Sequence, residues 1–264
     1  MHSRFRYARL MAQLVGHIIS GPNQCVYLER EQASLEYKAM IEVTPEECQA
    51  MLVRGWRRFG PEYFRPVCGA CQKCVSIRVP VAAFRPTHSQ RRALHKCREV
   101  RLQVGPPQVD EERIALYHRW HAMREDVRGW NKNPVSFQQY FYQFCFPHPC
   151  AREFAYYLGE RLIGVGLVDE TPCALSSIYF FFDPDVSRLS LGIAAALMEI
   201  EVARQRGLEH VYLGYWVPGC ASMEYKRQFR PHELLVGRPE ENEEPVWVPE
   251  DRFPLVDIER HARP

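Results

Sequence analysis

Three cysteines separated by two residues each form the sharpest chemical signal in the sequence: Cys68, Cys71 and Cys74. Thiolates at this spacing can converge on one metal ion, because a tight turn brings their sulfur atoms to about 2.3 Å from zinc. A tetrahedral site needs a fourth ligand, and Cys25 is the candidate. The same run is compatible with an iron–sulfur cluster. We therefore expect a zinc or iron–sulfur site at these four cysteines, with semi-buried thiols or a redox pair as the alternatives.

Basic and aromatic side chains alternate on both sides of the cysteine run. Residues 54–65 interleave arginines with Trp, Phe and Tyr rings, and residues 85–101 carry eight basic side chains (two of them histidines) against the single acid Glu99. Cationic groups bind phosphates, and aromatic rings stack on unpaired bases. One such run would be read as a solvated helix face. Two runs flanking the cysteines favour a nucleic acid as partner.

The composition is that of an ordinary globular protein. The chain has 264 residues, of which 46% are hydrophobic and 25% charged, and its 34 Lys and Arg exceed its 32 Asp and Glu by two charges. Any nucleic-acid partner must therefore be bound by a local patch. No apolar run approaches the roughly 20 residues of a membrane span, so no membrane partner is expected. Ten cysteines are too few for a disulfide scaffold of this length, which predicts a reduced, cytoplasmic protein.

The helices and strands that must position these residues are predicted from helix-capping residues, turn residues and hydrophobic patterns. Thr44-Pro45-Glu46-Glu47 is a capping box, and Ser89, Asp110 and Ser136 are expected to open three more helices. From residue 150 onward the pattern predicts a hairpin, a buried strand, a long helix capped by Ser190, another strand and a short basic helix. The ranges are 153–158 with 161–168, 174–182, 191–206, 210–215 and 223–229. This order predicts an α+β fold with a sheet in the C-terminal part.

The order of these elements resembles the acetyltransferase-like (GNAT) superfamily. In that superfamily, the helix after the cofactor-side strand opens with an Arg/Gln-x-x-Gly-x-Gly/Ala turn that binds the pyrophosphate of coenzyme A. Residues 188–194 keep the glycine and a small residue, but at a different spacing from Arg188. A coenzyme A-dependent N-acetyltransferase is therefore one functional hypothesis, with an anion site at the start of this helix.

A longer resemblance covers about residues 20–237. Residues 212–235, with Gly219-Cys220-Ala221 followed by Met223-Glu224-Tyr225-Lys226, closely resemble the C-terminal signature of the aminoacyl-tRNA–protein transferases of the N-end rule. That family contains eukaryotic arginyltransferases and bacterial aspartate/glutamate leucyltransferases, and the cysteine run is similar to the bacterial form. Further matching segments are Cys25–Leu28, Gly55–Gly60, Tyr63–Pro66, Ser89–Arg92, Ser177–Pro184 and Ser190–Gly192.

The resemblance implies aminolysis of an ester. The α-amine of an N-terminal Asp or Glu attacks the carbonyl that joins leucine or arginine to its tRNA, and the product is marked for N-end rule degradation. The ester is already activated, so no cofactor is needed for the chemistry, and a partly neutral α-amine needs little general base. The bacterial likeness favours leucine as the donated amino acid. A non-catalytic RNA-binding or metal-sensing protein is a third alternative.

The resemblance also assigns roles to residues and regions. Tyr225 and Lys226 are expected to be catalytic, by orienting the ester or stabilising its oxyanion. Residues expected to bind the substrate are Arg57, Arg58, Arg65 and Tyr179, and those expected to bind tRNA are Arg91, Arg92 and Lys96. The first three arginines could equally hold tRNA phosphate. Gly105-Pro106-Pro107 is the best domain boundary. It gives an N-terminal domain at 1–105 with the cysteine cluster, a GNAT-like C-terminal domain at 106–237 and an irregular acidic tail at 238–264.

Overall fold

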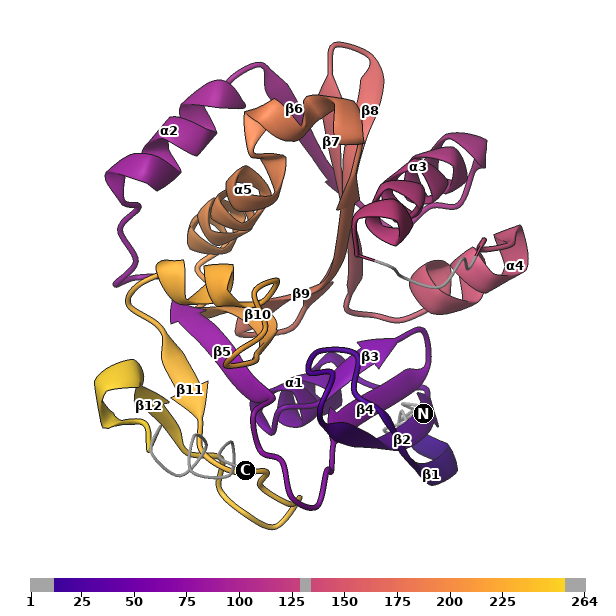
Figure 1. Cartoon of the computed structure of the whole chain (residues 1–264), viewed down its shortest axis with the longest axis vertical. Helices are drawn as coiled ribbons and strands as arrows, with labels where there is room; N and C mark the ends of the chain where they lie inside the picture. The colour runs from indigo at the N-terminus through magenta and orange to yellow at the C-terminus, as the bar shows by residue number, and fades with distance from the viewer. Residues whose placement is uncertain (1–11, 129–133, 255–264) are drawn as a thin grey trace, which may run out of the picture.

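Two β-sheets organise residues 12–128 and 134–254, which the computed structural model describes (Figure 1). The smaller sheet is antiparallel, with strand order β1-β2-β4-β3. Its strands are β1 (Gln13–Gln24), β2 (Gln32–Ile41), β3 (Arg57–Phe59) and β4 (Glu62–Pro66), and helix α1 (Pro45–Val53) connects β2 to β3. This is the smaller N-terminal α+β unit that the sequence predicts.

The larger sheet has eight strands in the order β12-β11-β5-β10-β9-β8-β7-β6. They are β5 (Val75–Pro80), β6 (Val100–Gly105), β7 (Ala151–Leu158), β8 (Arg161–Glu170), β9 (Ala174–Phe182), β10 (His210–Trp216), β11 (Glu233–Leu235) and β12 (Trp247–Pro249). Strands β9 and β10 are parallel and the other pairs are antiparallel. The prediction of an α+β fold with a mixed sheet is therefore confirmed.

Helices cover both faces of the larger sheet (Figure 1). One face carries α3 (Glu111–Arg128), α4 (Phe137–Tyr140) and a π-helical turn (Phe141–Cys145), and the other carries α2 (His88–Lys96) and α5 (Leu191–Gln205). Successive strand residues point to opposite faces. Accordingly, Phe154 joins the core beneath α5, whereas Ala155 joins the core beneath α3. Three 3-10 turns complete the described part of the fold: Pro184–Leu189, Glu224–Gln228 and Glu250–Arg252.

The predicted helix starts are mostly confirmed. Thr44 forms a capping box with Glu47, and Ser136 caps α4. The cap of α2 is Thr87 rather than Ser89, because Gln90 stands three residues after Thr87 and closes a capping box with it. Ser190 occupies the predicted N-cap position of α5, but its φ is 58° and its side chain makes no cap hydrogen bond. The prediction of a side-chain cap is therefore wrong.

The larger sheet takes strands from both sides of the predicted boundary at residue 105. Strands β5 and β6 precede that boundary, and β7 to β11 follow it. The tail from residue 238 is not wholly irregular, since β12 pairs with β11. The division into 1–105, 106–237 and 238–264 thus stays a prediction. Among the described residues, no helix has the length and apolar character of a membrane span.

Candidate functional site

A cavity of about 430 Å³ opens where β9 and β10 separate. The two strands pair only from Ala174 to Ser176; beyond that point β9 follows β8, whereas β10 follows β5. Side chains from β9, α3, α5 and the 224–228 turn line the space between them. They are Trp120, Arg124, Ser177, Ile178, Tyr179, Phe180, Phe182, Ser190, Leu191, Gly192, Ile193, Ala195, Ala196, Glu199, Leu213, Ser222, Met223, Tyr225 and Lys226. Three predicted site residues, Tyr179, Tyr225 and Lys226, therefore meet at one cavity.

Lys226 is the buried cation of this cavity. Its side chain is only 7% exposed, and its Nζ donates a hydrogen bond of 2.6 Å to the carbonyl oxygen of Tyr215. Burial, reinforced by the nearby charge of Arg57, lowers the pKa of Lys226 to about 7. The adjacent Tyr225 is 40% exposed and forms part of the rim. A lysine with this pKa changes charge near neutral pH, which suits a group that stabilises or exchanges charge during a reaction.

Arg57 reaches the floor of the same region from β3. Its Nη1 donates to the hydroxyl of Ser176 at 2.6 Å and its Nη2 donates to the carbonyl oxygen of Ser177. Gly214, which has φ +83°, lies between this guanidinium and Lys226: an added Cβ would lie 3.5 Å from Arg57 Nη2 and 3.5 Å from Lys226 Nζ. Two cations are therefore close together: Lys226 lines the cavity, and Arg57 lies next to it outside the lining.

Glu199 on α5 supplies the acid of the site, and sequence reasoning missed it. The side chain is 3% exposed and lines the cavity, where it accepts a hydrogen bond from the hydroxyl of Ser177. Burial raises the pKa of Glu199 to about 7. An acidic residue among apolar neighbours on a buried helix was the available signal, because carboxylates are almost never fully buried without a partner.

Tyr179 is positioned by aromatic packing on the α3 face of the sheet. Its hydroxyl shares a hydrogen bond of 2.8 Å with Nε2 of His121, and its ring stacks on Phe144 with centroids 5.6 Å apart. Burial raises the pKa of Tyr179 above its ordinary value, so the phenol stays protonated at neutral pH. It can therefore present a neutral donor or acceptor to a substrate in the cavity.

Arg58 and Arg65 lie away from the cavity and are engaged in ion pairs. Arg58 is 5% exposed and binds Asp169 of β8 through two nitrogens, one of them at 2.9 Å. Arg65, also 5% exposed, pairs with Glu36 at 2.7 Å and with Glu240 at 2.8 Å. These contacts join strands to neighbouring segments. A role of either arginine in substrate binding stays a prediction.

The predicted tRNA-binding residues lie on the exposed side of α2. Arg91, Arg92 and Lys96 are exposed, and Lys96 Nζ donates to the carbonyl oxygen of Arg188 at 3.1 Å. Arg92 and Lys96 border a second cavity of about 200 Å³ together with Ser190 and Ile193. Because these last two residues also line the larger cavity, a basic surface leads directly into it.

The four predicted metal ligands gather in one region without closing a site. The thiols of Cys25, Cys68 and Cys71 join burial in raising the pKa of Cys74 to about 12. All four residues belong to the described part of the chain, yet no three of their sulfur atoms lie within 4.8 Å of one another. A group that meets this distance was not predicted: Cys48, His148 and Cys150. The structure therefore contains a Cys/His cluster able to hold a metal, at other residues than the predicted ones.

Two family models match this chain, one over its N-terminal part and one over its C-terminal part. Residues 23–92 match the family model "Arginine-tRNA-protein transferase, N terminus", and residues 112–236 match "Arginine-tRNA-protein transferase, C terminus". Solved structures are more distant: FemX has a TM-score of 0.46 and 8% identity over 70% of this chain and 64% of that chain. L-PGS from Bacillus licheniformis has a TM-score of 0.42 and 11% identity over 82% of this chain and 68% of that chain.

Curated relatives cover most of the chain. Aspartate/glutamate leucyltransferase of Campylobacter jejuni (strain 81116) is 36% identical over 84% of this chain and 94% of its own length. The proteins of that name from Chromohalobacter salexigens and Pseudomonas fluorescens are 37% and 38% identical, each over 82% of this chain and over 88% and 92% of their own lengths. The chain therefore belongs to the family of arginine-tRNA–protein transferases and aspartate/glutamate leucyltransferases.

Proposed function

We propose that this chain is a cytoplasmic aminoacyltransferase that moves leucine from leucyl-tRNA to the N-terminal Asp or Glu of a protein, marking that protein for N-end rule degradation. The observation that carries the proposal is the cavity between β9 and β10, which buried Lys226 and Glu199 both line inside the region that matches the family's C-terminal model. The relatives' name, aspartate/glutamate leucyltransferase, supports the same acceptor and donor.

The two buried ionisable groups have complementary roles in aminolysis. The attacking α-amine must lose its proton, and Glu199, with a pKa of about 7, is a suitable acceptor. The ester carbonyl develops negative charge as the new C–N bond forms, and Lys226 in its protonated form is a suitable partner for that oxyanion. Collapse of the intermediate re-forms the carbonyl, now that of a peptide bond, and breaks the ester C–O bond; the leaving tRNA oxygen takes up the proton that Glu199 accepted from the amine. Tyr225 and Tyr179 orient the ester.

The lining of the cavity supports leucine as the donated amino acid. Its walls are mainly apolar and aromatic, with Trp120, Phe180, Phe182 and Leu213 among them, and Glu199 is its one acidic side chain within the described residues. An apolar wall binds the isobutyl group of leucine by burying its surface, whereas an arginyl group would leave a charge without sufficient partners. Arg57, next to the cavity, is the cation that we propose for the acidic acceptor side chain.

The basic face of α2 is the proposed path of the tRNA acceptor end. We expect the double substitution Arg92→Glu, Lys96→Glu to raise the KM for leucyl-tRNA about tenfold or more while changing kcat little, because these side chains bind phosphate rather than the reacting ester. The dependence of binding on salt should weaken, by roughly one in slope for each phosphate that the variant no longer neutralises. Filter binding at several salt concentrations, beside steady-state kinetics, measures both.

A matched control is Arg98→Glu, which reverses an exposed charge close to the end of α2 but outside both cavities. An equal loss of affinity in that variant would show a diffuse electrostatic effect instead of a defined path.

Cys25, Cys68, Cys71 and Cys74 are proposed as a zinc or iron–sulfur site outside the reaction itself. Their gathering around Cys74 and their sulfur donors support this assignment. The reaction needs no cofactor, because the ester supplies the activated acyl group. Metal analysis of the Cys68→Ser, Cys74→Ser variant tests the site.

The carboxylate of Glu199 should control the acidic limb of the pH profile. Only its ionised form accepts a proton, so in the parent chain kcat should fall below about pH 7. Glu199→Gln should lower kcat about 10- to 100-fold and remove the ionisation of Glu199 from the profile, leaving that of Lys226 and that of the substrate amine at about 7.7–8.0. Glu201→Gln, an exposed neighbour on α5, should keep the parent profile. An unchanged profile in Glu199→Gln would remove Glu199 from the mechanism.

A transfer assay tests the function. The purified chain is incubated with a peptide that begins with Asp or Glu and with labelled leucyl-tRNA or arginyl-tRNA in separate reactions. Label is expected in the peptide only from leucyl-tRNA, and ribonuclease treatment or N-terminal acetylation of the peptide should abolish it. Transfer from arginyl-tRNA instead would show that arginine, and not leucine, is the donated amino acid. Absence of both products, with acetyl transfer from acetyl coenzyme A to an amine, would establish the N-acetyltransferase alternative.

A further inference from the structure

Cys48, His148 and Cys150 come together from two separate parts of the fold. Their ligand atoms, the two Sγ and one imidazole nitrogen, all lie within 4.8 Å of one another. Cys48 belongs to α1 beside the smaller sheet, whereas Cys150 directly precedes β7 of the larger sheet. Both cysteines are buried, at 3% and 0% exposure, and His148 is half-buried. We propose that these three residues form a zinc site that connects the two sheets.

The donors and their spacing fit zinc. Two thiolates and one neutral imidazole are a preferred ligand set of this ion, and bonds of about 2.0–2.3 Å place the ligand atoms of a tetrahedral site roughly 3.5–3.8 Å apart. Closing from at most 4.8 Å requires shifts of about 1 Å or less. When zinc binds, each thiol loses its proton to the solvent, so two bound thiolates balance the 2+ charge of the metal. A neutral complex is what a buried position tolerates.

The surroundings of His148 already hold its ring in place. Its Nε2 shares a hydrogen bond of 2.9 Å with the Tyr63 hydroxyl, and its Nδ1 accepts one of 3.2 Å from the backbone N–H of Cys150. If Nδ1 binds the metal in place of the Cys150 N–H, the protonated Nε2 can still donate to the Tyr63 hydroxyl and orient the imidazole, as is usual around zinc-bound histidines. Flanking prolines, Pro147 and Pro149, restrict the backbone on both sides.

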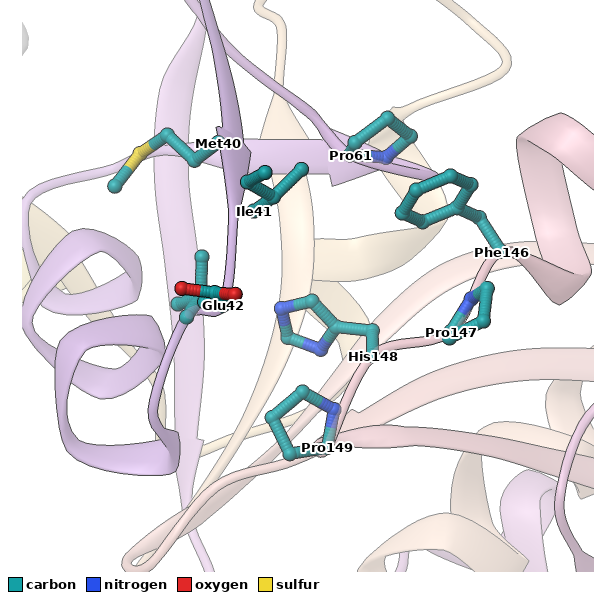
Figure 2. A pocket seen from close by; sticks show the side chains of 9 residues that line it. Met40, Ile41, Glu42, Pro61, Phe146, Pro147, His148 and Pro149 are labelled. Atoms are coloured by element: carbon teal, nitrogen blue, oxygen red, sulfur yellow. The ribbon is translucent and has the colours of Figure 1, made fainter. Parts of the chain in front are cut away.

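A cavity of about 330 Å³ borders the cluster at His148 (Figure 2). Residues 40–43, Pro61 and residues 146–149 line it, and Figure 2 shows the His148 ring projecting from the Pro147–Pro149 segment toward Ile41 and Glu42. In the proposed site, zinc reaches the two cysteines past His148, and a water molecule from the cavity occupies the fourth coordination position. The cavity is a different one from that of Lys226 and Glu199.

The test separates this cluster from the cysteines around Cys74. In the Cys68→Ser, Cys74→Ser background, chelator-treated and reduced protein is titrated with Zn²⁺ against a chromophoric competitor, and with Co²⁺ as a spectroscopic probe. We expect one metal ion per chain and the thiolate-to-cobalt absorption of a tetrahedral site. Adding His148→Ala and Cys150→Ser should abolish both signals, whereas adding Cys173→Ser, which lies outside both groups, should leave them unchanged.

A measurement on the parent chain keeps the test independent of how the variants fold. Zinc should slow alkylation of Cys48 and Cys150 at least tenfold, as measured by peptide mass spectrometry, without changing that of Cys173. Failure of zinc to protect them, or metal binding that survives the His148→Ala, Cys150→Ser change, would overturn the proposal. A Cys48–Cys150 disulfide in zinc-free protein isolated without reductant would do so as well and would define a redox pair instead. None of these readouts depends on aminoacyl transfer.

Discussion

Lys226→Ala is expected to lower kcat for leucyl transfer about 100- to 1000-fold while leaving the affinity for leucyl-tRNA within about twofold. The ammonium group is the buried cation closest to the reacting ester in the proposed site, and removing one preorganised oxyanion partner costs this much in other acyl-transfer enzymes. Its pKa of about 7 also predicts that kcat falls as the pH rises above 7, since the protonated form is the active one. Single-turnover kinetics with preformed leucyl-tRNA complex measure the chemical step.

Two comparisons make this result interpretable. Lys38 forms an ion pair with Glu241 and does not line the cavity. The Lys38→Ala variant should therefore transfer leucine at the normal rate. Lys226→Arg keeps a positive charge at high pH and should remove the alkaline limb of the profile. Normal turnover in folded Lys226→Ala would eliminate the lysine as a catalytic residue, whereas a raised KM with unchanged kcat would assign it to substrate binding.

Asp169→Ala is expected to reduce the free energy of unfolding by about 3–5 kcal/mol. Asp169 and Arg58 are each 5% exposed and form a two-nitrogen ion pair between β3 and β8. Loss of the carboxylate leaves a buried guanidinium without its counter-charge, which is a costly change. Urea unfolding gives the difference from the shift of the midpoint at constant slope. Arg58→Met combined with Asp169→Leu should recover most of the stability, because an apolar pair replaces both charges.

The adjacent surface pair provides the control. Arg206→Ala removes a half-exposed partner of Glu170, the residue next to Asp169, and should change stability by about 1 kcal/mol or less. A similar small effect of Asp169→Ala would show that the buried pair is not structural. If Asp169→Ala is stable but Arg58→Ala raises the KM for acidic peptides, Arg58 has the substrate-binding role that the sequence predicts.

The sequence predicted a helix or strand correctly where a short local motif determines the backbone conformation. The Thr44 capping box and the glycine-turn hairpin of β7 and β8 depend on residues a few positions apart, and both are present. Strand β1 gave no comparable signal, because it is exposed along nearly its whole length and so lacks an alternation of buried and exposed residues. The extra turn at Phe141–Cys145 is π-helical, which no spacing rule in the sequence specifies.

The sequence predicted only those residues of the candidate site that belong to a recognisable motif. Tyr225 and Lys226 stand together in a recognisable segment, so the sequence alone pointed to them. Glu199 lies within an apolar helix, and only the separation of β9 from β10 gives its carboxylate a cavity to face. Cys48 and Cys150 are distant in sequence and become neighbours through the packing of α1 against the segment before β7. Such juxtapositions depend on tertiary structure, which periodicity does not encode.

Strand β5 has a consequence for how the protein is made. Its neighbours in the sheet are β10 and β11, which begin at His210 and Glu233, whereas β5 ends at Pro80. On a translating ribosome, both edges of β5 therefore remain unpaired until well over a hundred further residues have been synthesised. Unpaired edges recruit other chains, and such distant pairing is slow to form. We expect newly made chains to depend on a holding chaperone during synthesis, and fragments that end before β10 to aggregate.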